Sequence, residues 1–332
     1  MGHRNEIHRR EVLSGFLAAV ALASAPAIAL SRTSNKALRG VFPIGFTPVR
    51  TDGSVDFDGL AAQAEFCKRG GVHGLAWPQI ASGWMVLEEK ERLTGAEVIV
   101  QAARGASMAI VIGVQSRRGD FLETERYAKH AEKIGADALI SLPPENLDPK
   151  DKLTFYQRLG QVTPLPLFAQ AVGDFSVNLL VEINESVPTF QFVKDEAGDP
   201  LQRVIEITER TRGRLKSFSG SGVSTMITEM ELGFTGHCPF TSLSDLYASA
   251  FDLFHAGKRQ EAFDQFGRIQ AASRAFAQSN VNVLIARGVF KPGTTLRTAP
   301  AAPGSTTVHS PAESPEEIKR VLDSYMKTYL RA

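Results

Sequence analysis

The chain has 332 residues, of which 37 are lysine or arginine and 36 are aspartate or glutamate, so its net charge is +1. Hydrophobic residues make up 43% and charged residues 22%, as in an average globular protein, which excludes extended disorder and a collagen-like chain. The balanced charge predicts no nucleic-acid or membrane partner, since both would need a basic surface. The two cysteines, Cys67 and Cys238, make neither a disulfide scaffold nor a zinc ribbon.

Residues 1–29 have the features of an export signal. The arginine pair at 9–10 precedes the apolar run 15–25, and small residues around Ala27 and Ala29 offer cleavage sites. The paired arginines resemble a twin-arginine signal. A membrane anchor is the alternative, but this run is too short to span a hydrocarbon core of about 30 Å comfortably. We therefore expect cleavage near Ala27 or Ala29, and a periplasmic or secreted protein with no membrane segment after cleavage.

From residue 40 to about residue 255, eight short apolar runs alternate with helical patterns such as 93–103 and 124–134. None of the runs alternates between polar and apolar residues, which suits strands buried on both faces. Short links between strand and helix indicate parallel pairing with right-handed crossovers. Eight such units predict a closed (β/α)8 TIM barrel over 40–255, with an open doubly wound sheet as the alternative. The runs are Val41–Phe46, Gly74–Trp77, Met108–Val114, Ala138–Leu142, Leu165–Ala169, Phe190–Val193, Leu215–Phe218 and Thr235–Cys238.

The pattern changes over 256–332, where we expect a C-terminal helical extension. Residues 257–279 predict one helix, and 291–312, rich in proline, threonine, alanine and serine, predict a long surface loop. The tetrapeptide Ser314-Pro315-Glu316-Glu317 is a capping box with proline at the first helical position, so a further helix begins there. These helices are expected to pack beside the barrel, and the apolar stripe of the last one also fits a subunit contact.

Lys194 is the strongest candidate for chemistry. It ends the sixth apolar run, and functional groups of a parallel barrel lie at the carboxyl ends of the strands. A lysine amine that is desolvated at such a position can attack a carbonyl carbon. The alternatives are a surface lysine just beyond the strand, or a lysine paired with Asp195 or Glu196.

Three segments of the chain resemble the dihydrodipicolinate synthase and N-acetylneuraminate lyase family of class I aldolases, and the resemblance covers about residues 40–290. It implies a (β/α)8 barrel with C-terminal helices, a homo-oligomer (tetramer or dimer), and a Lys194 that forms a Schiff base with pyruvate or another 2-oxo acid. It also implies that Thr47 contacts the substrate, and no cofactor is called for. The segments are Thr47-Pro48 with Asp52-Gly53-Ser54-Val55-Asp56, Leu87-Glu88-Glu89-Lys90-Glu91-Arg92, and Val193-Lys194-Asp195 with Gly198-Asp199.

The chain departs from this family at three functional positions. The family's Gly-Thr-Thr-Gly-Glu, which holds the substrate carboxylate, is replaced by residues 79–84, where only Ser82 keeps a hydroxyl. Gln170 stands where the family carries a tyrosine that moves protons, and an amide has no titratable proton near neutral pH. The tyrosine that normally follows strand four falls near Glu145. Either another group moves protons, or the aldol chemistry is lost.

Other side chains at the carboxyl end of the barrel are weaker candidates. Glu145 and His237 are candidate acids or bases, while Arg117 fits a substrate carboxylate as a bidentate partner. Solvated surface or core packing is the alternative for each of them. The remaining candidates for the pocket wall are Trp84, the backbone at Gly220, and Cys238, which shares a strand end with His237 so that only one of that pair points inward.

The scattered histidines give no metal-binding spacing, so no metal is expected, with a divalent ion held by carboxylates as the alternative. Three functions remain in view. The first is an exported lyase or hydro-lyase that acts through Lys194. The second is a binding protein that captures a 2-oxo acid or a sugar acid without turnover, and the third, a metal-dependent barrel hydrolase, lacks ligands.

Overall fold

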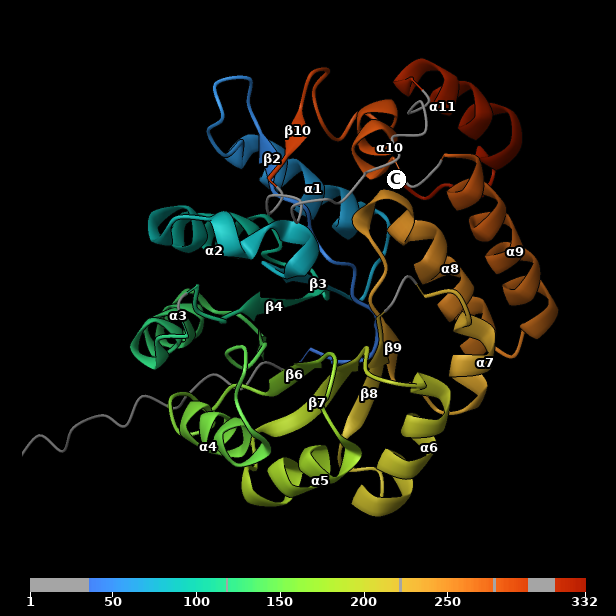
Figure 1. Cartoon of the computed structure of the whole chain (residues 1–332). Coiled ribbons are helices and arrows are strands. Elements are labelled where there is room, and N and C mark those ends of the chain that lie inside the picture. Colours follow the sequence, from blue (N-terminus) through green and yellow to red (C-terminus); the bar gives the residue numbers. More distant parts are fainter. Residues whose placement is uncertain (1–35, 118, 221–222, 277–278, 298–313) are drawn as a thin grey trace, which may run out of the picture. The chain divides into compact units, whose positions relative to one another are not determined.

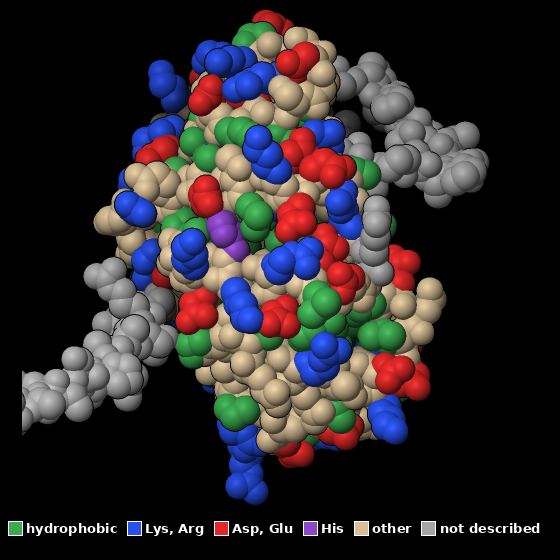
Figure 2. Space-filling model, turned by 90° about the vertical axis from the view of Figure 1, so that its left-hand side faces the viewer, with side chains coloured by type: hydrophobic (Ala, Val, Ile, Leu, Met, Phe, Trp, Pro, Cys, Tyr) green, Lys and Arg blue, Asp and Glu red, His purple; other side chains and the backbone are tan. Residues whose placement is uncertain are grey.

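The computed structural model describes residues 36–332 except 118, 221–222, 277–278 and 298–313 (Figure 1). The predicted signal peptide, 1–29, and most of the predicted loop 291–312 lie outside the described residues. Within the described ranges, no helix combines the length and the apolar character that crossing a bilayer requires. On the face drawn in Figure 2, basic and acidic side chains are interspersed rather than gathered by sign.

Eight parallel strands form the barrel, in the order β1-β9-β8-β7-β6-β5-β4-β3. Just after β1, Ile44 pairs with Ala76 of β3, and the amide of Gly45 donates to the carbonyl of Ala76 at 3.0 Å, which brings the two edges together. The predicted TIM barrel is therefore confirmed, and the open sheet is wrong. The strands are β1 (Gly40–Val41), β3 (Gly74–Trp77), β4 (Ala109–Gly113), β5 (Ala138–Ser141), β6 (Leu167–Ala171), β7 (Phe190–Asp195), β8 (Lys216–Ser219) and β9 (Gly236–His237).

Helices follow the strands and cover the outside of the barrel (Figure 1). Several begin where the sequence provides a cap: Asp148 and Asp199 each accept a hydrogen bond from an amide of the first turn, and each is followed by proline. The helices are α1 (Phe57–Arg69), α2 (Glu89–Ala102), α3 (Phe121–Ile134), α4 (Pro149–Leu159), α5 (Val177–Ser186), α6 (Pro200–Thr211), α7 (Met226–Glu231) and α8 (Ser244–His255).

Inward-facing phenylalanines fill the barrel below its carboxyl end. Phe168 of β6 stacks on Phe192 of β7 with ring centroids 4.4 Å apart, and Phe218 of β8 meets Phe42 edge-on at 5.1 Å. The outward side chains of the same strands are buried under the helices, which explains why the apolar runs do not alternate. We call Phe42, Phe168, Phe192 and Phe218 the aromatic floor.

The C-terminal extension packs beside the barrel as α9 (Arg259–Ala275), α10 (Asn280–Ala286) and α11 (Pro315–Val321). The helix predicted over 257–279 is confirmed as α9, although it begins at Arg259 and ends at Ala275. The predicted start at Ser314 is confirmed: its side chain accepts a hydrogen bond from the amide of Glu317 at 3.2 Å. A short strand, β10 (Thr295–Leu296), pairs antiparallel with β2 (Pro48–Val49) and was not expected from the sequence.

A buried ion pair fastens the end of the chain to the barrel. Arg287, just after α10, makes two contacts of 2.7 Å with Asp245 of α8, and their side chains are 2% and 0% exposed. Arg287 also donates to the backbone oxygens of Ser242, at 2.9 Å, and Ala332, at 2.6 Å. The amide of Arg331 donates to the same Asp245 carboxylate at 2.9 Å. This cluster holds α8, α10 and the final residues together.

Candidate active site

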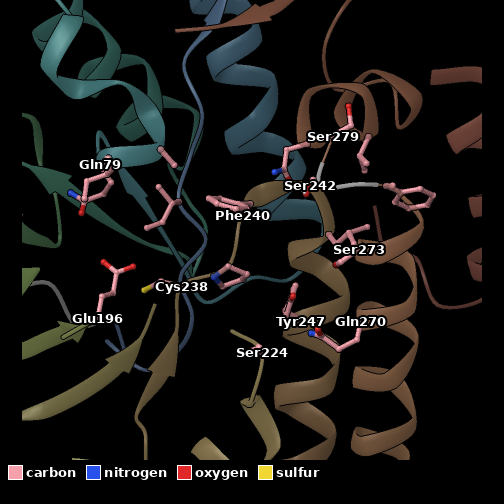
Figure 3. A pocket seen from close by; sticks show the side chains of 18 of the residues that line it. Gln79, Glu196, Ser224, Cys238, Phe240, Ser242, Tyr247, Gln270, Ser273 and Ser279 are labelled. Atoms are coloured by element: carbon pink, nitrogen blue, oxygen red, sulfur yellow. Dashed lines mark hydrogen bonds between the residues drawn. The ribbon is translucent and has the colours of Figure 1, made fainter. Parts of the chain in front are cut away.

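A cavity of about 930 Å3 opens at the carboxyl ends of the strands, a size typical of small-molecule sites. Its inner wall comes from β6, β7 and the segments that follow β1, β3 and β9, and its outer wall comes from α8, α9 and α10. In Figure 3, Gln79, Glu196 and Cys238 lie on one side, with Tyr247, Gln270 and Ser273 on the other. The cavity therefore joins the barrel mouth to the C-terminal helices.

Lys194 lies on the inner wall, where its strand position predicts it. It is the neighbour of Gln170 in the β6–β7 register, is 4% exposed, and stands two residues beyond Phe192 of the aromatic floor. Because side chains alternate along a strand, Asp195 points the other way and pairs with Arg203 at 2.8 Å. Burial raises the pKa of the Asp195 carboxyl group, and the contact with Arg203 opposes that rise.

Glu196 joins Lys194 to Gln170. Its Oε2 atom lies 2.6 Å from Nζ of Lys194 and accepts a hydrogen bond of 2.7 Å from Nε2 of Gln170. The Oε1 atom of Gln170 is buried and has no hydrogen-bond partner among the described residues. The sequence indicated Glu196 only as an ion-pair partner of the lysine, and this pairing exists inside the cavity rather than at the surface.

Gly220, just after β8, provides the space that Glu196 occupies. A Cβ atom added to this glycine would lie 2.4 Å from both Cγ and Oε1 of Glu196. The backbone of Gly220 was predicted to line the pocket, but it does not contact the cavity; it stands behind the carboxylate.

Of the pair at the end of β9, Cys238 faces the cavity and His237 faces away. Burial raises the pKa of the Cys238 thiol to about 12, so the sulfur is a protonated thiol near neutral pH. His237 is fully buried between the barrel and its helices, where Nδ1 lies 2.9 Å from the Glu229 carboxylate. The predicted acid–base role of His237 therefore lacks access to the cavity.

The two hydroxyls predicted to bind substrate are engaged with the backbone. Thr47 donates to the carbonyl oxygen of Ser82 at 2.7 Å and accepts from the Trp77 indole at 2.9 Å. Ser82 donates to the carbonyl oxygen of Gly45 and accepts from the amide of Gln79 at 2.9 Å. Both residues are fully buried and lie outside the cavity wall. They shape the turn after β3 that brings Gln79 to the cavity. Gln79 was not among the candidate residues predicted from the sequence.

Three further candidates also lie outside the cavity wall. Glu145 is exposed in the loop after β5. Arg117 contacts the Glu88 carboxylate at 3.0 Å, and this hydrogen bond raises the pKa of the guanidinium. Trp84 is half-buried next to the turn after β3. Among the residues that the structure describes, no group of three His, Cys, Asp or Glu side chains is placed to hold a metal ion.

A family model described as "Dihydrodipicolinate synthetase family" matches residues 37–304. The chain belongs to this family. It is 28% identical over 209 residues to a 4-hydroxy-tetrahydrodipicolinate synthase of Rhizobium meliloti, a match that covers 60% of this chain and 67% of the relative. An N-acetylneuraminate lyase of the same organism is 26% identical over 264 residues, which cover 76% of this chain and 82% of that enzyme.

A crystal structure of a dihydrodipicolinate synthase from Rhodopseudomonas palustris shares the fold, with a TM-score of 0.70 and 20% identity over 86% of this chain and 97% of that one. Of these relatives, one is named as a synthase and another as a lyase. Within that family fold, Lys194 and Gln170 are neighbours in the β6–β7 register. The structure adds the carboxylate of Glu196 and the amide of Gln79 to the candidate site residues predicted from the sequence.

Proposed function

We propose that the protein is a Schiff-base-forming lyase, of the aldolase or hydro-lyase type, that acts on a 2-oxo acid through Lys194. The observation that carries the proposal is a lysine amine, 4% exposed, on the wall of a cavity of about 930 Å3. The aromatic floor lies below it and shields the amine from water on that side. Family membership supports the same chemistry.

The reaction begins with proton transfer, because only the neutral amine attacks a carbonyl carbon. Glu196 Oε2, at 2.6 Å, is the group in contact with Nζ that can take this proton. The amine then forms a bond to C2 of the 2-oxo acid. The carbonyl oxygen leaves as water with one proton from the amine nitrogen and the proton that Glu196 returns, so Glu196 is again a carboxylate. The resulting iminium accepts electrons from the adjacent carbon, which permits either cleavage of a carbon–carbon bond or loss of water.

The outer wall favours a substrate that is larger than pyruvate alone. It presents the Arg274 guanidinium and several uncharged polar groups. Among the uncharged groups are Gln270, Ser273 and Ser279, which suit hydroxyl groups on an extended tail (Figure 3). The turn after β3 brings the Gln79 amide to the wall, while the Ser82 hydroxyl donates to the carbonyl of Gly45. The carboxylate of a substrate would therefore find no free hydroxyl of Ser82 at this turn. We therefore place a polyhydroxylated 2-oxo acid ahead of smaller substrates.

A binding protein that captures such an acid without turnover is the second candidate. The observation in its favour is Gln170, whose amide stands next to Lys194 and cannot carry a proton near neutral pH. The buried ion pair of Lys194 and Glu196 argues against a binding protein. Burying the amine costs desolvation free energy, and a site that only binds its ligand gains nothing in return.

Reductive trapping tests the proposal. The full chain is incubated with pyruvate and a panel of longer 2-oxo acids in the presence of borohydride, and intact mass is measured. We expect one adduct per chain in the wild type and none in Lys194→Met. The control is Lys152→Met, which removes another buried lysine, one that pairs with Asp174 at 2.6 Å outside the cavity wall. No adduct with any 2-oxo acid, or an adduct that persists in Lys194→Met, would overturn the proposal.

Export and assembly remain predictions of the sequence. We propose that the mature enzyme begins near residue 28 or 30 and works in the periplasm or outside the cell. We also propose that it assembles as a homo-oligomer, as the resemblance to the family implies.

A further inference from the structure

The carboxylate of Glu196 is placed to do more than take the proton of the amine. Once Glu196 has returned the amine proton to the departing oxygen it is a carboxylate again, and its Oε2 atom lies beside Nζ within the cavity. Gln170 Nε2 holds that oxygen from the neighbouring strand at 2.7 Å, and its own Oε1 lacks a partner among the described residues. Gln170 therefore acts as a positioning residue for a group that does titrate.

We infer that Glu196 is the general acid–base group that moves the carbon-bound proton of the Schiff base, in the place of the tyrosine that Gln170 replaces. The inference rests on the proposed function. In an iminium on Nζ, C3 of the 2-oxo acid is two bonds from the nitrogen, so an oxygen in contact with Nζ reaches the C3 hydrogen. Carboxylates serve as general bases when they lie within hydrogen-bond reach of the proton they take.

The step balances within the site. Glu196 Oε2 takes a proton from C3, the C3–H electron pair becomes the π bond between C2 and C3, and the π pair of the C2=N bond moves to the nitrogen. The product is a neutral enamine beside a protonated carboxyl group. The reverse step returns a proton to C3. No second substrate and no oxidant is needed.

The other titratable groups on the cavity wall are poorly suited to this role. Burial raises the pKa of the Cys238 thiol and of the Tyr247 phenol to about 12, so both are protonated near neutral pH. Tyr247 also comes from α8, across the cavity from Glu196 (Figure 3). Arg274 is a fixed cation. Lys194 itself is the nitrogen of the Schiff base, which leaves Glu196.

Exchange of the pyruvate methyl protons with D2O isolates this step, since it requires the enamine but no second reactant. NMR follows the loss of the methyl signal, and borohydride trapping of the same samples counts the Schiff base. We expect Glu196→Gln to form the trappable adduct more slowly, because the amine loses its proton acceptor, and exchange per adduct to fall about 10²-fold or more, the usual contribution of a general base. Gly220→Ala is the second variant, because its new Cβ displaces the carboxylate without removing its charge. We expect it to slow exchange as well, by less than Glu196→Gln.

The outcomes separate the two proposals. If the wild type forms no adduct, the Schiff-base lyase fails and the role of Glu196 fails with it. If the adduct forms and Glu196→Gln exchanges protons at the wild-type rate per adduct, the lyase stands and the inference is overturned. If Tyr247→Phe abolishes exchange while Glu196→Gln retains it, the proton carrier is the tyrosine of the outer wall, which also overturns the inference.

Discussion

Replacing Asp245 by asparagine tests the ion pair that fastens the C-terminal segment to α8. The substitution keeps the size of the side chain but leaves the Arg287 guanidinium, 2% exposed, without a carboxylate. It also weakens the acceptor for the amide of Arg331. Breaking a buried ion pair at one partner costs about 3–5 kcal/mol, because the remaining charge stays desolvated. We expect a loss of unfolding free energy in that range.

Urea unfolding of the full chain, followed by circular dichroism and by tryptophan fluorescence, measures this loss. The matched control is Glu317→Gln, which removes one negative charge from a pair with Arg320 whose side chains are 46% and 60% exposed. An exposed pair of this kind contributes about 0–1 kcal/mol. If Asp245→Asn costs no more unfolding free energy than Glu317→Gln, the buried pair contributes no more than a surface contact, contrary to this expectation.

Two further predictions concern titratable groups. Desolvation raises the pKa of both Cys67 and Cys238 to about 12, so neither thiol should react with iodoacetamide near neutral pH before the chain unfolds; rapid alkylation of the native protein, detected by mass, would contradict this. Desolvation and the Arg39 guanidinium, 3.0 Å from the ring, lower the pKa of His255 to about 4. Below about pH 6.5, His255 of the unfolded chain binds a proton that the folded chain does not yet bind. The contribution of His255 to the stability of the fold is therefore complete above about pH 6.5 and is lost as the pH falls through 4. An NMR titration of the imidazole ring measures this pKa. We expect the pKa of His255 to rise in Arg39→Gln, and an unchanged value would contradict the role given to Arg39.

The apolar runs predicted the barrel because its strands are buried on both faces, yet they ended too early at the functional strands. The runs 165–169 and 190–193 stop before Gln170 and Lys194, while β6 and β7 continue to Ala171 and Asp195. Polar residues that point into a cavity interrupt an apolar run without ending the strand. The reactive end of a barrel strand is therefore the part that hydrophobicity alone assigns to a loop.

The remainder of the site depends on orientations that the sequence does not record. Alternation showed that one residue of the pair His237 and Cys238 points inward, but the phase came only from the register of β9 with β8. The position of Glu196 depends on the missing side chain of Gly220, which is distant in sequence. Ser82 kept a hydroxyl, yet its use by the carbonyl of Gly45 follows from the packing of the turn after β3.

The aromatic floor closes the cavity on the side of the barrel interior. Phe42, Phe168, Phe192 and Phe218 fill the barrel below Lys194, so reactants, products and the water released on imine formation share the opening at the carboxyl end. A molecule joined to the amine lies deeper than anything that enters after it. In a reaction between two compounds, the one that becomes attached to the lysine must therefore arrive first and depart last, a compulsory order that steady-state inhibition patterns can detect.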